Sequence, residues 1–164
     1  MKEIDEFREV VKKLRSKDGC PWDSVQTLST LKTCLVEEAA EVVCGVNIYD
    51  QAGDGENLKE ELGDLLFIIM LMSEIAKEDE LFEFEDVVNG IKEKMVRRHP
   101  KIFVEGDTAR MGEEVKTWAE IKAQEKARKK LKEDVYLKPA MQETKELVDK
   151  AMVRKNFNTT NLVI

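Results

Sequence analysis

The run LLFIIMLM, residues 65–72, restricts the possible folds of this chain more than any other stretch. It lies within a proline-free segment, about residues 57–77, which predicts a helix with apolar side chains on every face. Such a helix must be buried all round, either inside a helical bundle or at an interface between copies of the chain. We therefore predict that other helices surround it and that the chain forms a homo-oligomer.

Several other segments carry apolar residues at helical spacing, and the alternation typical of strands is nowhere sustained. Only eight glycines and three prolines interrupt the 164 residues. The sequence therefore predicts an all-α chain, with Thr27 as the N-cap of the second helix and Pro139 at the start of the last. The predicted helices cover the opening segment to about residue 18, and then about 28–46, 57–77, 85–98, 113–131 and 139–157.

The charge and the cysteines narrow the class of protein. A net charge of −7 argues against generic nucleic-acid binding, which needs an excess of basic residues. No stretch approaches the roughly 18 apolar residues of a membrane span, and the first residues lack an apolar signal core. We expect a cytoplasmic protein that binds neither nucleic acid nor membrane. Cys20, Cys34 and Cys44 are spaced unlike a zinc or redox pair and are expected to be reduced.

Two carboxylate triplets occupy adjacent predicted helices. Because a helix turns about 100° per residue, the members of each triplet lie on one arc of their helix. The 19 residues between Glu41 and Glu61 suffice for an antiparallel hairpin that brings the two arcs together. The triplets are Glu37, Glu38 and Glu41 in the first helix, and Glu60, Glu61 and Asp64 in the second.

Clustered carboxylates among apolar residues require a cation. Asp64 adjoins several leucines, where an unpaired carboxylate would shift its pKa or cost several kcal/mol. Ligands that are all oxygen favour Mg²⁺ or Mn²⁺ over zinc or copper. Gly63, next to Asp64, is expected to let the two helix backbones approach closely. A di-iron site is excluded because it needs Glu-x-x-His from two helices, and the chain has one histidine.

Five motifs occur in the order found in one known family. They are CPWDSVQT, EEAAE, EELGDLLF, KMVRRHPKIF and WAEIKAQEK. Together they resemble the MazG family of nucleoside triphosphate pyrophosphohydrolases over about residues 5–128. The resemblance implies a four-helix-bundle-like all-α fold, a homodimer or larger oligomer, and Mg²⁺-dependent hydrolysis of nucleoside triphosphates to nucleoside monophosphate and pyrophosphate.

The resemblance also implies roles for individual residues. It makes Glu38, Glu41, Glu61 and Asp64 the metal ligands. Glu37 and Glu38 are candidates to orient or deprotonate the attacking water. The candidate nucleotide-binding residues are Asn57, Lys59, Lys94, Arg97, Arg98 and Trp118.

Some of these residues have a second interpretation. Lys94, Arg97 and Arg98 would form a phosphate clamp, or simply complement the dipole at a helix end. Trp118 would stack on a base or pack in the core. His99 is interpreted as a helix-end cap. The charge run KAQEKARKKLKED, which ends the fifth predicted helix, is interpreted as a solvated helix end.

The chain departs from the family pattern in three ways. Leu28 and Lys101 replace histidines, which would alter the choice of substrate. Many relatives carry two copies of the domain, whereas this chain has one set of motifs. We expect a single-copy or truncated form, with a MazG-like domain over 1–132 and a tail over 133–164 that resembles the linker and start of a second repeat.

Two other functions stay open at this point. One is a non-enzymatic helical oligomer that binds a partner protein through solvated acidic faces. The other is a narrower pyrophosphatase for nucleotides such as dUTP or dCTP on a related fold. Stabilisation by Mg²⁺ would favour an enzyme over the partner-binding protein.

Overall fold

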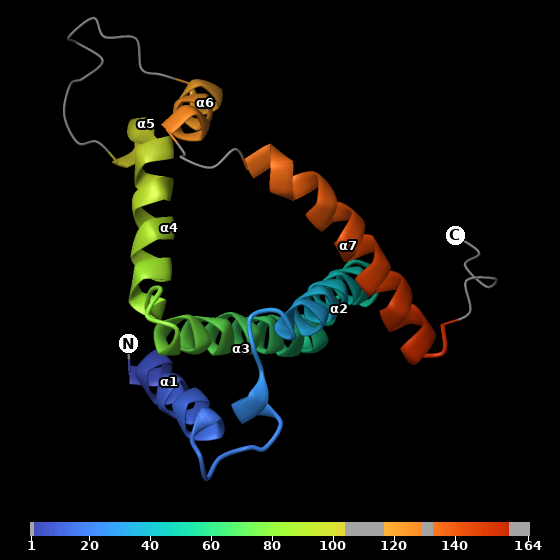
Figure 1. Ribbon diagram of the computed structural model, residues 1–164. Helices are drawn as coiled ribbons and strands as arrows, with labels where there is room; N and C mark the ends of the chain where they lie inside the picture. Colours follow the sequence, from blue (N-terminus) through green and yellow to red (C-terminus); the bar gives the residue numbers. More distant parts are fainter. Residues whose placement is uncertain (1, 104–116, 129–132, 158–164) are drawn as a thin grey trace, which may run out of the picture. The chain divides into compact units, whose positions relative to one another are not determined.

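The computed structural model describes residues 2–103, 117–128 and 133–157, and every regular element in these ranges is helical (Figure 1). The all-α prediction is confirmed. The elements are α1 (Lys2–Arg15), the 3₁₀ turn η1 (Asp23–Val25), α2 (Leu31–Ala52), α3 (Glu56–Glu78), α4 (Phe84–Arg98), α5 (Pro100–Phe103), α6 (Trp118–Arg128) and α7 (Glu133–Arg154).

The chain divides into two compact units. The first combines Met1–Phe84 with Ala140–Ile164, and the second is Glu85–Pro139. The first unit therefore holds α1, α2, α3 and most of α7, and the second holds α4, α5, α6 and the start of α7. The domain boundary expected after residue 132 stays a prediction.

Helices α2 and α3 form the hairpin that the sequence predicts. Gly53 ends α2 in the left-handed conformation, with φ of 72°, and its N–H donates to the Tyr49 carbonyl over 2.8 Å. The helices approach each other closely at Gly45, where a Cβ would lie 2.8 Å from the Leu58 Cα. The role predicted for Gly63 is wrong, because a Cβ there would meet nothing within 4 Å. The close approach occurs at a glycine of α2 rather than of α3.

The core of the first unit lies where α1 and the start of α2 meet the second half of α3. Its buried members are Val11, Leu31, Met70, Leu71 and Ile75. The apolar run of α3 is only partly covered, because Ile69 stays 37% exposed while Met70 and Leu71 are 1% and 0% exposed. The predicted burial on every face is thus incomplete within one copy of the chain, and the predicted oligomer remains untested.

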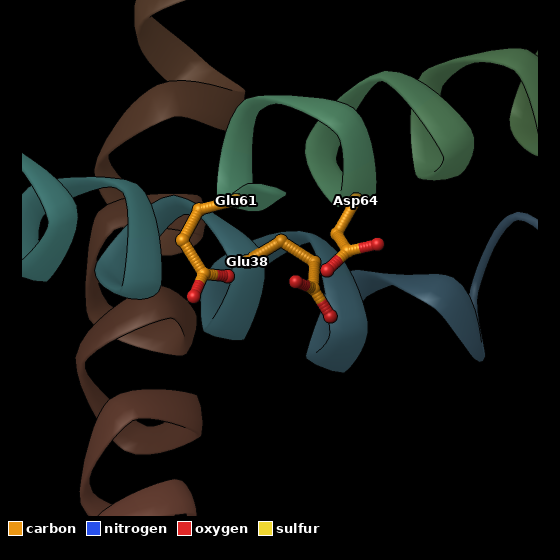
Figure 2. Close-up of side chains that lie close together, drawn as sticks. All are labelled: Glu38, Glu61 and Asp64. Carbon is orange, nitrogen blue, oxygen red and sulfur yellow. The ribbon is translucent and has the colours of Figure 1, made fainter. Parts of the chain in front are cut away.

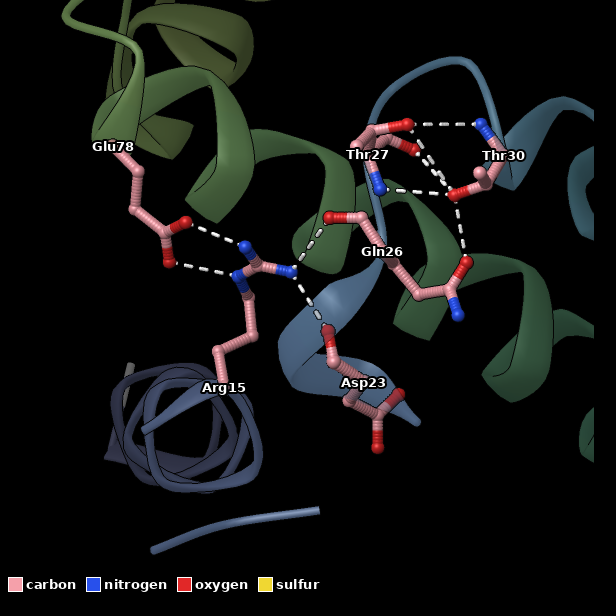
Figure 3. A network of polar contacts seen from close by, with 6 residues as sticks. All are labelled: Arg15, Asp23, Gln26, Thr27, Thr30 and Glu78. Atoms are coloured by element: carbon pink, nitrogen blue, oxygen red, sulfur yellow. Dashed lines mark hydrogen bonds and ion pairs between the residues drawn. The ribbon is translucent and has the colours of Figure 1, made fainter. Parts of the chain in front are cut away.

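A polar network joins α1, the η1 turn and α3 (Figure 3). The Arg15 guanidinium donates to both Glu78 carboxylate oxygens over 2.7 and 2.5 Å, and to the carbonyls of Asp23 and Gln26 over 2.8 and 3.2 Å. One side chain therefore satisfies carbonyl groups of the loop and pairs with the end of α3. In the same network the Thr27 hydroxyl accepts from the Thr30 N–H over 3.2 Å. The predicted N-cap role of Thr27 is nevertheless wrong, because α2 begins at Leu31 with Thr30 as its N-cap.

Several predicted helix boundaries differ from the structure: α1 ends at Arg15 rather than near residue 18, and α2 begins at Leu31 rather than at about residue 28. α2 runs to Ala52 rather than Val46, since the left-handed glycine that terminates it comes only at Gly53. α7 begins at Glu133, so Pro139 lies inside it rather than at its start. Proline removes one backbone hydrogen bond, but the remaining bonds of a 22-residue helix carry the helix through it. In the fifth predicted helix, α6 covers 118–128 and Thr117 lies just before it, while 113–116 and 129–131 lie outside the described residues.

Among the helices in the described ranges, none combines the length and apolar character needed to cross a bilayer. Cys20, Cys34 and Cys44 are free thiols. Trp22, in the loop before η1, is 50% exposed.

Candidate metal and nucleotide site

Three predicted metal ligands lie together on the α2–α3 hairpin. Glu38 of α2 and Glu61 and Asp64 of α3 each offer one carboxylate oxygen, and these oxygens all lie within 4.8 Å of one another (Figure 2). The hairpin sets this proximity because equivalent arcs of its two helices face each other. The carboxylates are close enough to share one ion.

The surroundings of the cluster fit a hard cation. Glu38 and Glu61 are partly buried, and the Glu61 Oε2 is shielded from solvent without a hydrogen-bond partner. Burial, followed by repulsion from Asp64 and Glu61, raises the pKa of Glu38. A carboxylate oxygen without a hydrogen-bond partner, beside two other acidic groups, provides the all-oxygen ligands that a hard divalent ion prefers. The residues present therefore fit Mg²⁺ or Mn²⁺.

Asn57 supports the cluster from the first turns of α3. Its side-chain amide donates to the Glu61 Oε1 over 3.0 Å. The other carboxylate oxygen, Glu61 Oε2, takes no part in this hydrogen bond. The Asn57 Oδ1 is itself buried without a partner. Asn57 thus orients one member of the cluster. Lys59, two residues further along α3, forms an ion pair with the exposed Glu56 instead.

Glu41 and Glu37 do not belong to the three-carboxylate cluster. Glu41 forms an ion pair with Lys155, and Glu37 forms one with Arg154. Arg154 is the last residue of α7 and Lys155 follows it, so the end of α7 lies beside α2. A cavity of about 440 Å³ separates α7 from the hairpin and is lined by Glu37, Glu41, Glu61 and Lys155, among others. The fourth predicted metal ligand is therefore engaged by the protein's own cation.

The predicted nucleotide-binding residues of the second unit form a basic site of their own. Lys94, Arg97 and Arg98 at the end of α4 line a cavity of about 670 Å³, together with Lys122, Glu125 and Lys126 of α6 and Glu133 of α7. Trp118 has the Arg98 guanidinium 5.4 Å and the Lys122 ammonium 5.0 Å from its ring centroid. These residues therefore line one cavity, and phosphate binding by them stays a prediction.

The structure describes the surroundings of two further residues, Trp118 and His99. Trp118 is 48% exposed, so it does not serve as a core residue in this unit. The His99 Nδ1 lies 2.8 Å from the Met95 carbonyl oxygen, which is the helix-end contact expected of a cap.

The sequence interpretation missed four residues. Lys155 and Arg154 could not be predicted, because each forms an ion pair with a residue more than 100 positions away and no local sequence pattern indicates such a pair. Lys122 and Glu125 belong to the charge run that was interpreted as a solvated helix end. Their positions four and seven residues after Trp118 place them near one face of α6, which could have indicated a shared site.

Comparison with known proteins assigns the family. Residues 26–103 match the MazG nucleotide pyrophosphohydrolase domain, a range that contains the carboxylate cluster and the basic end of α4. The chain belongs to the MazG family. This membership confirms the resemblance seen in the five sequence motifs.

Several relatives of this MazG chain are similar over most of its length. A nucleoside triphosphate pyrophosphohydrolase/pyrophosphatase MazG of Thermotoga maritima is 42% identical over 127 residues, which are 77% of this chain and 47% of the relative. The nucleoside triphosphate pyrophosphohydrolase of Escherichia coli K12 is 35% identical over 130 residues, 79% of this chain and 48% of the relative.

A third relative is named only as an uncharacterized protein. Bacillus subtilis YabN is 36% identical over 124 residues, which are 76% of this chain and 24% of that protein. The chain therefore spans about half the length, or less, of these three relatives.

Proposed function

We propose that this chain hydrolyses nucleoside triphosphates, as ribonucleotides or deoxyribonucleotides, to nucleoside monophosphate and pyrophosphate with Mg²⁺, or with Mn²⁺ in its place. The observation that carries the proposal is the convergence of Glu38, Glu61 and Asp64 within 4.8 Å in a MazG domain. The names of the relatives from T. maritima and E. coli support the same reaction.

The carboxylates of the hairpin would hold the ion. Glu38, Glu61 and Asp64 are the proposed first ligands, and Glu41 is the fourth once it leaves Lys155. When bound, the ion would bind phosphate oxygens and lower the pKa of the attacking water. The buried, unpaired Glu61 Oε2 supports this assignment because it has no protein donor to satisfy it.

Other residues of the chain would handle the water and the substrate. Glu37 is the proposed group that orients the water or accepts its proton, with Glu38 as the alternative. Asn57, which orients Glu61, and Lys59 are proposed to bind the substrate from the first turns of α3. The basic groups Lys94, Arg97 and Arg98 would bind phosphates, and Trp118 would present its exposed ring to the base.

The decisive experiment is a panel of nucleoside and deoxynucleoside triphosphates incubated with Mg²⁺, in which pyrophosphate and orthophosphate are measured separately. Pyrophosphate release supports the proposal, and release of orthophosphate alone overturns it. A narrow preference for dUTP or dCTP would show the specialised pyrophosphatase. Full activity of Glu38→Gln at saturating Mg²⁺ would remove Glu38 from the mechanism. Absence of any hydrolysis and of any Mg²⁺ effect on melting would favour a partner-binding protein.

We also propose that the chain acts as a homo-oligomer in the cytoplasm. Large apolar side chains remain exposed on the hairpin, including Val43 at 59%, Tyr49 at 53% and Leu62 at 49%. A second copy would cover such side chains and remove them from water. Multi-angle light scattering tests the assembly, and a monomer at micromolar concentration would contradict it.

A further inference from the structure

One carboxylate holds both arginines at the end of α4. The Glu125 Oε1 accepts from the Arg97 Nε over 2.8 Å and lies 2.6 Å from its Nη2, while the Glu125 Oε2 accepts from the Arg98 Nε and Nη2 over 3.0 and 2.6 Å. Each oxygen therefore takes the paired donors of one guanidinium. This arrangement fixes both the position and the plane of two groups that carry long, flexible side chains.

The two arginines differ in exposure. The Arg98 side chain is 12% exposed and that of Glu125 is 20% exposed, whereas the Arg97 side chain is 53% exposed. Arg98 is thus held between Glu125 and the Trp118 ring, 5.4 Å from the ring centroid. About half of the Arg97 side chain is open to solvent. The Glu125 carboxylate therefore holds the Arg98 guanidinium beneath the surface and the Arg97 guanidinium at the surface.

The cavity around these groups has an excess of positive charge. Among the described residues, its lining includes five basic side chains and two acidic ones, Glu125 and Glu133. On electrostatic grounds alone, an acid in such a cavity would weaken the binding of a polyanion. Glu125 therefore needs a reason to be there, and the fixed geometry of Arg97 and Arg98 supplies one.

We propose that Glu125 is a positioning residue for the substrate's phosphates: it holds Arg97 and Arg98 in the orientation that binds a polyphosphate chain. The inference rests on the proposed function, which supplies the substrate. It gives α6 a role in phosphate binding, because the residue that positions the arginines of α4 lies on α6. Glu125 acts through the two arginines and makes no contact with the reacting atoms. Ordering the donors in advance removes an entropic cost that binding would otherwise carry.

The test compares the binding of inorganic tripolyphosphate to the wild-type protein and to Glu125→Gln by calorimetry, with melting temperature as the check on folding. The positioning role predicts binding weakened by about tenfold, because small displacements of binding groups have effects of this order or larger. A purely electrostatic role predicts the opposite, tighter binding, because a negative charge has been removed. Unchanged or tighter binding by the folded variant therefore overturns the proposal.

Two further variants sharpen the comparison. Glu133→Gln removes the same charge from the same cavity and is expected to leave tripolyphosphate binding unchanged or tighter. Glu125→Asp keeps the charge with a shorter reach and is expected to restore part of the lost affinity. A lower melting temperature in Glu125→Gln with wild-type affinity of the folded protein would show a merely structural tie between α4 and α6, and would also overturn the proposal.

Kinetics separate this inference from the proposed function. If the wild-type protein releases pyrophosphate, the positioning role predicts a higher KM for the nucleotide in Glu125→Gln, partly reversed in Glu125→Asp. If the wild-type protein releases no pyrophosphate but Glu125→Gln still loses affinity for tripolyphosphate, the reaction fails and the positioning role stands. Failure of the wild-type protein to bind tripolyphosphate overturns the positioning role itself.

Discussion

Lys155, one residue beyond the end of α7, forms an ion pair with Glu41 in the middle of α2. Arg154 makes the equivalent contact with Glu37, and Lys32 pairs with Glu143 over 2.9 Å. The end of α7 thus neutralises two acidic groups beside the proposed metal site. The positive charge of Lys155 also lowers the pKa of Glu38, although burial and the other carboxylates outweigh it.

Replacement of Lys155 is expected to strengthen metal binding. In Lys155→Gln, Glu41 loses its internal cation and becomes available to the ion, so the dissociation constant for Mn²⁺ should fall by about two- to fivefold, the range for an exposed ion pair. Electron paramagnetic resonance of free Mn²⁺ measures it. Lys150→Gln, on an exposed turn of the same helix, is the control for loss of charge alone. Equal effects of the two substitutions would show that the Glu41 pair is irrelevant.

Neutralising Glu38 should separate stability from metal binding. Without metal, Glu38→Gln relieves repulsion from Asp64 and Glu61, so the melting temperature is expected to rise by a few degrees, or about 1 kcal/mol. The rise that Mg²⁺ produces in the wild-type protein should be lost. Differential scanning calorimetry with and without Mg²⁺ measures both effects.

Glu60→Gln is the matched control for this experiment. It removes one charge from an exposed turn of α3, outside the three-carboxylate cluster. The control should keep the Mg²⁺ response of the wild-type protein. Retention of that response in Glu38→Gln would contradict the metal assignment.

The two glycines of the hairpin should respond differently to alanine. A Cβ at Gly45 would lie 2.8 Å from the Leu58 Cα and 3.1 Å from its backbone nitrogen, so Gly45→Ala must push α2 and α3 apart. We expect a loss of about 1–3 kcal/mol, as for overpacked cores. Gly63→Ala meets no neighbour and should gain up to about 1 kcal/mol from helix propensity. Urea unfolding measures both, and equal destabilisation would contradict the close approach at Gly45.

The Arg15–Glu78 pair should contribute stability that depends on pH. Hydrogen bonding to Arg15 lowers the pKa of Glu78 below its ordinary value of 4.5. The contribution is therefore present above about pH 4.5 and is lost as the pH falls through the lower pKa of the folded state. Glu78→Gln should lose about 1 kcal/mol at pH 7, because the carboxylate is partly exposed.

Thermal unfolding between pH 7 and pH 3 follows this difference. The wild-type protein and Glu78→Gln should converge in stability as the pH approaches 3. Lys77→Gln, which alters a neighbouring charge without touching Arg15's pair, serves as a comparison. A gap between the wild-type protein and Glu78→Gln that is constant across this range would show that the carboxylate charge makes no contribution.

Local sequence patterns were enough to predict the helices, the hairpin and the acidic cluster. Helical periodicity depends on residues a few positions apart, so the cores of α2, α3 and α4 follow from the sequence. The pairing of Glu38 with Glu61 and Asp64 was also predictable, because the two helices are consecutive and their spacing repeats. Gly63 shows the limit of such reasoning, since a glycine in a motif does not reveal which helix face meets its neighbour.

The sequence by itself determined the all-α fold, the family and the carboxylates able to hold an ion, because each of these depends on neighbouring residues or on motifs in order. Only the tertiary structure decided that α2 and α3 approach closely at Gly45, that Lys155 engages Glu41, and that Glu125 holds Arg97 and Arg98. These contacts join residues 13 to 114 positions apart along the chain. The packing of whole helices determines these contacts, and the local spacing of residues in the sequence does not specify that packing.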